Sequence, residues 1–174
     1  MKRMVFLLGF MGCGKTYWAK RMAGILDVPC YDLDAMIERY SALPVNQIFE
    51  NTGEAAFRDL EKKVLHHGMH LVPGMYAAGG GTPCFFDNMD WMNEIGLTIY
   101  LKTPTNILVE RLKTERLLRP LLAQVEEHAL EAHIEQLVSQ RSPFYTKAAI
   151  CLEQSPENRP VFEQILLEAI NAEY

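Results

Sequence analysis

The chain of 174 residues lacks an apolar run long enough to cross a membrane, and it lacks an excess of basic residues. A membrane-spanning helix needs roughly 18 or more consecutive apolar residues, and no segment approaches that length. The 17 Lys and Arg residues are outnumbered by 22 Asp and Glu residues, which gives a formal net charge of -5. General nucleic-acid and anionic-membrane binders carry basic surfaces. We therefore expect neither a nucleic acid nor a membrane as partner.

Cysteines with metal-binding spacing are also lacking, because Cys13, Cys30, Cys84 and Cys151 are scattered and form no CxxC pair. A disulfide framework is typical of smaller secreted domains, so we expect reduced, mostly buried thiols in a cytoplasmic protein. The short apolar run near the N-terminus has no small-residue cleavage pattern, which argues against a secretory signal. Repeats, low-complexity tracts and linker-like stretches are absent as well. A single domain over residues 1–174 is expected.

The sequence does contain a regular alternation of short apolar runs with longer amphipathic segments. Strands are expected at residues 3–8, 28–33, 74–78, 97–101 and 148–152. Helices are expected at residues 15–26, 35–40, 45–51, 54–67, 87–94, 105–113, 126–140 and 160–172. This alternation predicts βαβ units and a central parallel sheet covered on both faces, which is a three-layer α/β/α fold. Ligands of such sheets bind beyond the carboxyl ends of the strands.

Residues 9–16 (Gly-Phe-Met-Gly-Cys-Gly-Lys-Thr) match the phosphate-binding loop G-x-x-x-x-G-K-[S/T] at every fixed position. The run follows an expected strand and opens an expected helix, as the motif requires. Its glycines allow N–H groups to curl around phosphates, and the helix N-terminus favours negative charge. We expect Lys15 to bridge the β- and γ-phosphates of ATP and Thr16 to ligate Mg²⁺. The expected ATP-binding residues are Gly12, Cys13, Gly14, Lys15, Thr16 and Tyr17.

Two carboxylates, Asp32 and Asp34, lie at the end of the strand expected at residues 28–33. In an extended segment, side chains at i and i+2 point to the same side. We expect Asp32 to hold Mg²⁺ through water and Asp34 to accept the proton of an attacking hydroxyl. A structural alternative stays open, in which Asp34 only caps the helix expected at residues 35–40.

Further motifs follow in order along the chain: Phe57-Arg58 with Glu61, Gly79-Gly80-Gly81, Arg119-Pro120-Leu121-Leu122 and Arg141-Ser142-Pro143-Phe144-Tyr145. Together with the phosphate loop and the acidic pair, they resemble the shikimate kinase family over almost the whole chain. The resemblance implies a P-loop NTPase fold of the nucleoside-monophosphate-kinase type. It also implies ATP- and Mg²⁺-dependent phosphorylation of the 3-hydroxyl of shikimate, in the pathway to chorismate and the aromatic amino acids.

The resemblance also implies a substrate site. It assigns Arg58 and Arg141 to the shikimate carboxylate, which guanidinium groups bind bidentately. It assigns the reacting hydroxyl to Asp34 and a close backbone contact to Gly80, flanked by Gly79 and Gly81. Arg119 would stabilise charge on the transferred phosphoryl group. The catalytic set is then Lys15, Asp34 and Arg119.

Each of these assignments has a structural alternative. Arg58 could form only a surface ion pair with Glu54 or Glu61 on its own helix. Arg141 could be a helix C-terminal cation, and the three glycines could form a plain turn.

Residues 113–124 break helical periodicity and are rich in cations. We interpret them as a mobile lid that closes over ATP and excludes water. Arg111, just before this segment, is expected near the adenine, whereas no residue among 155–159 stands out as a second adenine contact. The alternative to the lid is a solvated charged loop.

We expect the protein to be a monomer. Two other functions remain open alongside shikimate phosphorylation. Another small-molecule kinase, for gluconate or for a nucleotide, would share the phosphate loop. A nucleotide kinase, however, needs a base pocket and phosphate-binding arginines in place of a carboxylate clamp. A nucleotide-binding module without catalysis would need neither Arg119 nor both aspartates.

Overall fold

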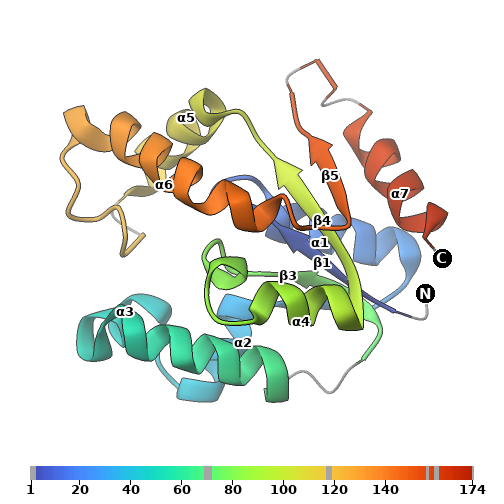
Figure 1. Cartoon of the computed structure of the whole chain (residues 1–174), viewed down its shortest axis with the longest axis horizontal. Coiled ribbons are helices and arrows are strands. Elements are labelled where there is room, and N and C mark those ends of the chain that lie inside the picture. Colours follow the sequence, from blue (N-terminus) through green and yellow to red (C-terminus); the bar gives the residue numbers. More distant parts are fainter. Residues whose placement is uncertain (1–2, 69–71, 117–118, 156, 159–160, 174) are drawn as a thin grey trace.

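The computed structural model describes residues 3–68, 72–116, 119–155, 157–158 and 161–173. At its centre lies a parallel sheet of five strands in the order β2-β3-β1-β4-β5 (Figure 1). The strands are β1 (Met4–Leu8), β2 (Cys30–Asp32), β3 (Gly74–Ala77), β4 (Gly96–Lys102) and β5 (Ile150–Glu153). The parallel sheet expected from the alternation of apolar and amphipathic segments is confirmed.

Helices connect these strands and cover the sheet. They are α1 (Lys15–Leu26), α2 (Leu33–Ser41), α3 (Val45–Lys63), α4 (Asn88–Ile95), α5 (Thr105–Glu115), α6 (Leu130–Tyr145) and α7 (Phe162–Ala172). A π-helical turn, η1 (Val64–Gly68), extends α3, and short 3-10 turns lie at η2 (Thr82–Cys84) and η4 (Glu127–Ala129). The start expected for the last helix at residue 160, and residues 117 and 118 of the expected lid, lie outside the described residues.

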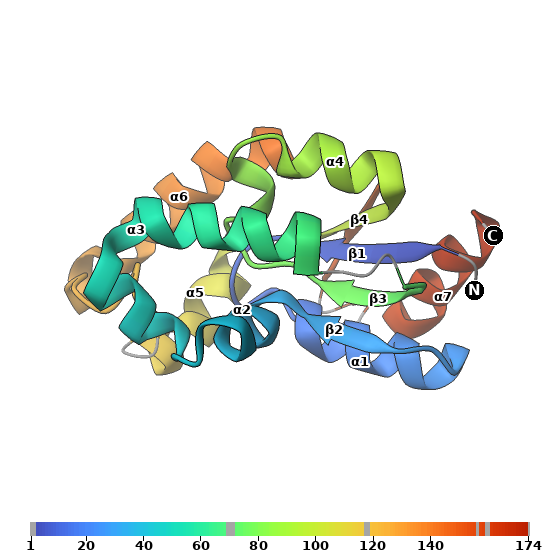
Figure 2. The ribbon, with the colours of Figure 1, turned by 90° about the horizontal axis from the view of Figure 1, so that it is seen from below.

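The central strand β1 is buried on both faces, because its successive side chains point to opposite sides of the sheet. Val5 and Leu7 belong to a core shared with α1, α5, α6 and α7. Met4, Phe6 and Leu8 belong to a second core shared with α2, α3 and α4. Figure 2 shows α1 on one side of the strands and α4 on the other. This is the expected three-layer arrangement, and it places the loop after β1 at the middle of the sheet's carboxyl edge.

The acidic pair is arranged differently from our expectation. β2 ends at Asp32, and α2 begins at Leu33, so Asp34 lies in the first turn of a helix. The expectation that both carboxylates leave an extended strand is therefore wrong. The N-cap of α2 is Asp32, whose Oδ1 accepts from the backbone N–H of Ala35 at 3.3 Å. Asp34 does not cap this helix.

The helices expected at residues 45–51 and 54–67 are confirmed as the two helical segments of α3, which a kink separates at Gly53 (φ 79°, ψ 173°), a conformation that glycine adopts readily. Beyond the kink, Phe57, Arg58 and Glu61 are buried. Helix α6 continues past residue 140 to Tyr145 and includes Pro143. Arg141 is therefore a buried residue within α6 and not a cation exposed at its end.

The four cysteines are free. Cys13 is buried and Cys84 is half-buried, but Cys30 and Cys151 are exposed on the two edge strands. The expectation of mostly buried thiols is wrong for these two. Within the described ranges, no helix is long and apolar enough to cross a membrane.

Candidate active site

Two cavities lie beside the loop that joins β1 to α1. One has a volume of about 370 Å³ and takes wall residues from α2, α3, α6 and the glycine run after β3; we call it the α3/α6 cavity. The other has a volume of about 290 Å³ and takes wall residues from α1, α5 and the segment after β5; we call it the α1/α5 cavity. Figure 1 shows α3 and α6 projecting past the same edge of the sheet.

The loop from Gly9 to Thr16 has the backbone of a phosphate cradle. Gly9, Gly12 and Gly14 have φ values of 141°, 79° and 96°, a region that side chains disfavour. Gly14 is the N-cap of α1 and no side chain caps this helix, so its first N–H groups are available to an anion. The buried Lys15 extends back over the loop, where its Nζ donates to the Gly9 carbonyl at 2.8 Å.

Thr16 and Asp32, the residues expected at the Mg²⁺ site, contact each other directly. The Thr16 hydroxyl donates to Oδ2 of Asp32 at 2.6 Å. Hydroxyl and carboxylate oxygens are the hard ligands that Mg²⁺ prefers, so the donor set fits this ion. No cluster of three or more His, Cys, Asp or Glu residues able to hold a metal is found in the described part of the chain. A Mg²⁺ ion here would therefore complete its shell with water and phosphate oxygens.

The α3/α6 cavity brings together all the residues that the resemblance assigns to the substrate. Its wall contains Asp34, Arg58, Gly79, Gly80, Gly81, Arg119 and Arg141. Sequence reasoning missed other wall residues, namely Glu38, Val45, Asn46 and Phe49. Their spacing is ordinary for amphipathic helices, so no signal in the sequence distinguishes them from core or surface positions.

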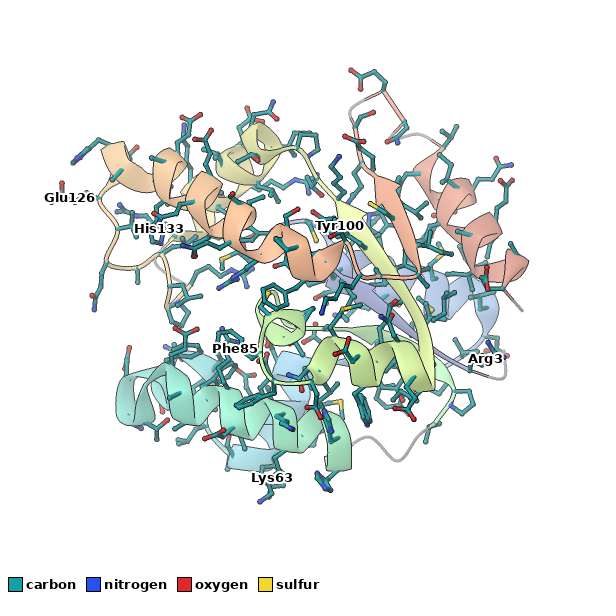
Figure 3. All side chains as sticks on the ribbon, in the orientation of Figure 1. Arg3, Lys63, Phe85, Tyr100, Glu126 and His133 are labelled. Carbon is teal, nitrogen blue, oxygen red and sulfur yellow. The ribbon has the colours of Figure 1, made fainter. Side chains whose placement is uncertain are left out.

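Arg58 is held by two carboxylates of its own helix. Its Nη1 donates to Oε2 of Glu61 at 2.8 Å, and its Nη2 donates to Oε1 of Glu54 at 3.0 Å. The Arg58 and Glu61 side chains are only 5% and 1% exposed, so this is a buried ion pair and not a surface one. The guanidinium also lies 4.4 Å from the ring centroid of Phe85, which is labelled in Figure 3.

The glycine run is required by this ion pair and is not a plain turn. A Cβ atom on Gly81 would lie 2.5 Å from Nη2 of Arg58, and a Cβ atom on Gly79 would lie 2.8 Å from Oε1 of Glu61. The same Glu61 oxygen accepts from the hydroxyl of the buried Thr82 at 2.6 Å. Any side chain at these two glycines would therefore displace the charged groups behind them.

Two arginines of the α3/α6 cavity have unused donors. Within the described residues, Nη1 of Arg141 and Nε of Arg119 are buried and have no hydrogen-bond partner. Arg141 is 7% exposed, with its guanidinium 5.5 Å from the ring centroid of Phe10. Burying an unpaired donor is costly, so such a group calls for a partner that the protein does not itself provide.

Asp34 is half-buried among other charged residues in the wall of this cavity. Burial, followed by the negative charges of Asp32 and Glu61, raises the pKa of the Asp34 carboxyl to about 6. The positive charges of Lys15 and Arg119 oppose this rise. A carboxyl group with a pKa near the working pH is suited to accept a proton and release it.

The segment expected to form a lid is partly packed. Leu122 is completely buried, and Nη1 of Arg116 donates to the Val125 carbonyl at 2.7 Å. Arg119 pairs with Oε2 of Glu115 at 2.6 Å. The alternative of a fully solvated loop is therefore wrong for residues 119–122, although whether the segment moves stays a prediction.

The α1/α5 cavity contains Arg111, whose Nη1 donates to the Gly12 carbonyl at 2.9 Å. Trp18 forms another part of the wall, and its Nε1 donates to Oε1 of Gln154 at 3.3 Å. Ser155 and Asn158 line the cavity as well, although neither stands out in the sequence. Of residues 155–159, where the sequence singles out no adenine contact, residues 156 and 159 lie outside the described residues.

A glycine-rich phosphate cradle beside a cavity lined by a carboxylate and two buried guanidinium groups defines a P-loop kinase for a small anionic molecule. The shikimate kinase family model matches residues 11–171. The shikimate kinase of Parabacteroides distasonis is 42% identical over 153 residues, which are 88% of each chain. The crystal structure of shikimate kinase from Bacteroides thetaiotaomicron aligns with a TM-score of 0.87 and 36% identity, covering 97% of this chain and 98% of that one. Shikimate kinase from Acinetobacter baumannii, solved in complex with shikimate, aligns with a TM-score of 0.90 and 30% identity over 99% and 95% of the two chains. The chain belongs to the shikimate kinase family, and its fold is that of the nucleoside-monophosphate-kinase-like P-loop proteins.

The two carboxylates that hold Arg58 provide a matched test of the buried pair. Glu61→Ala is expected to lower the free energy of unfolding by about 3–5 kcal/mol, because Arg58 then stays buried without its buried partner. Glu54→Ala removes a partner whose side chain is 43% exposed and is expected to cost no more than about 1 kcal/mol. Urea unfolding of both variants measures the difference. Equal losses would mean that Glu61 does not support Arg58 in the way described.

Proposed function

We propose that the protein transfers the γ-phosphoryl group of ATP to the 3-hydroxyl of shikimate, giving shikimate 3-phosphate and ADP. The buried, unpartnered Nη1 of Arg141, in the same cavity as Arg58 and Asp34, carries this proposal. A ligand for that cavity needs a carboxylate for the guanidinium groups and a hydroxyl for Asp34. Shikimate, a cyclohexene with one carboxylate and three hydroxyls, has both. Membership of the shikimate kinase family and the shikimate complex of the Acinetobacter relative support the same reading.

On the nucleotide side, bound Mg²⁺-ATP supplies the phosphoryl group and a metal charge that neutralises it. Lys15 and the N–H groups that begin α1 hold the phosphates. Thr16 would ligate the Mg²⁺ ion through its hydroxyl, and Asp32 would hold it through water. Arg111 and Trp18, in the wall of the α1/α5 cavity, enclose the adenine.

On the acceptor side, Arg58 and Arg141 bind the carboxylate and so fix the orientation of the ring. The backbone N–H of Gly80 supports the ring at close range. Asp34 then accepts the proton of the 3-hydroxyl as this oxygen attacks phosphorus, and Arg119 stabilises the charge on the phosphoryl oxygens. Positioning and electrostatics are thus the main contributions of the protein.

The rival functions are less well supported by the cavity. A nucleotide kinase would need a pocket for a base, whereas the α3/α6 cavity presents the guanidinium groups of Arg58 and Arg141. A module without catalysis would have no use for Asp34, whose carboxyl interacts with both Lys15 and Arg119.

We further propose that the enzyme works as a cytoplasmic monomer, because one chain supplies both cavities and its four cysteines are free.

ADP release with a panel of acceptors tests the proposal. The acceptors are shikimate, shikimate carboxamide, gluconate and AMP, with Lys15→Ala as the control that ties any turnover to the phosphate loop. Shikimate should be the preferred acceptor, and the neutral amide should lose about 30-fold or more in kcat/KM, because two buried guanidinium groups then lack their partner. Equal use of the amide, or preferred use of gluconate or AMP, would contradict the proposal.

The pKa of Asp34 predicts a pH dependence with a definite sign. Asp34 accepts a proton only when ionised, so kcat/KM for shikimate should be constant at high pH and fall as pH drops through about 6. At pH 5 the value should be about tenfold below the plateau. The residual activity of Asp34→Asn should lack this acid limb. A wild-type profile that is flat between pH 5 and 7, recorded on enzyme that stays folded, would remove Asp34 from the role of base.

A further inference from the structure

Tyr145, the last residue of α6, has a hydroxyl group that has no role in the proposed reaction. The residue is completely buried, and its ring packs against Tyr100 with a centroid distance of 5.1 Å. Figure 3 labels Tyr100 on β4, beside α6. The Tyr145 hydroxyl donates to the carbonyl of Gly80. Tyr145 is not among the described residues that line the two cavities, so it acts on a bound ligand only through other groups.

The Gly80 carbonyl belongs to the run of three glycines that follows β3. Three consecutive glycines have no side chains to restrict their backbone, so hydrogen bonds must fix its conformation. The two outer carbonyls of the run accept from backbone N–H groups three residues further on, at 3.2 Å and 2.8 Å. Those bonds are local. The bond from Tyr145 is different, because it ties the middle of the run to a separate helix.

The hydrogen bond from Tyr145 to Gly80 joins the glycine run, which packs against Arg58, to the helix that carries Arg141. Arg141 lies on α6 one turn before Tyr145. Arg58 packs against Gly81, where even a Cβ atom would lie 2.5 Å from its Nη2. A shift of the Gly80–Gly81 peptide would therefore shift the Arg58 guanidinium. A shift of α6 would shift Arg141.

We propose that Tyr145 is a positioning residue whose hydroxyl locks the Gly80–Gly81 peptide to α6 and so sets the spacing of Arg58 and Arg141 for one carboxylate. This inference rests on the proposed function, because it concerns the carboxylate of the acceptor.

The chemical state of Tyr145 suits this role. Burial raises the pKa of its hydroxyl well above the ordinary value, and the positive charge of Arg141 only partly opposes this rise. The hydroxyl therefore remains a donor to Gly80 across the working pH range.

Tyr145→Phe tests the proposal, because it removes the hydroxyl and keeps the ring. Tyr100→Phe is the matched control, since it removes the hydroxyl of the tyrosine whose ring packs against that of Tyr145. Tyr145→Phe should raise KM for shikimate about tenfold, because the Gly80 carbonyl loses its buried partner, and should change KM for Mg²⁺-ATP by less than about twofold. Tyr100→Phe should leave both values within about twofold of wild type.

A second arm separates positioning from general structural support. In an Arg141→Ala background, Tyr145→Phe should add less than about twofold, because both changes act on the same carboxylate and are not additive. Three results would overturn the proposal: unchanged kinetics in Tyr145→Phe, an equal rise in both KM values, or a full tenfold effect in the Arg141→Ala background. A Tyr145→Phe variant that fails to fold, as seen by circular dichroism, would assign the hydroxyl a purely structural role and overturn it too. Wild-type enzyme that does not phosphorylate shikimate would instead refute the proposed function.

Discussion

The buried ion pair between Arg58 and Glu61 is the interaction on which the acceptor side of this molecule depends. Two charges can remain away from water only if each is paired and its remaining hydrogen-bonding positions are satisfied. Glu54 and Thr82 provide those further bonds, and the absence of side chains at Gly79 and Gly81 makes room for them. The kink at Gly53 brings the second half of α3 to the position where this pair is buried.

Arg141 differs from Arg58 in having a buried donor left over within the described residues. An unpaired buried donor lowers the stability of the free protein and is satisfied when a suitable anion binds. Since the chain as a whole has a formal net charge of -5, an anionic ligand is attracted by these local groups and not by the overall field. The site is thus preorganised to bind a negatively charged ligand. Asp34 lies in the same site, and the pKa of its carboxyl group is raised toward neutrality.

Much of this arrangement could be predicted from the sequence, because its main signals are local. The phosphate loop needs glycines at fixed positions, and Gly9, Gly12 and Gly14 do adopt positive φ values. The alternation of strands and helices gave the parallel sheet. A short list of charged residues, Asp34, Arg58, Arg119 and Arg141, meets in one cavity as the resemblance implied.

The sequence-based expectations that were wrong have physical causes that a local sequence pattern does not contain. An aspartate is common both at the end of a strand and at the start of a helix, so the sequence does not decide between Asp32 and Asp34 as the cap. Asp32 is the cap because β2 ends at this residue and α2 begins at the next one. Proline usually ends a helix, yet α6 continues through Pro143. The burial of the Arg141 and Tyr145 side chains stabilises the helical conformation of this last turn. The contact from Arg111 to Gly12 depends on how α5 packs beside the loop, which no spacing in the sequence reports.

The central claim is that the unpaired Nη1 of Arg141 is the place of the substrate carboxylate. A crystal structure of the protein with shikimate tests this most directly. We expect one carboxylate oxygen within hydrogen-bonding distance of Nη1 of Arg141, the same carboxylate in contact with Arg58, and the 3-hydroxyl beside Asp34. A complex in which Nη1 of Arg141 stays unpaired while the carboxylate binds elsewhere would contradict the account.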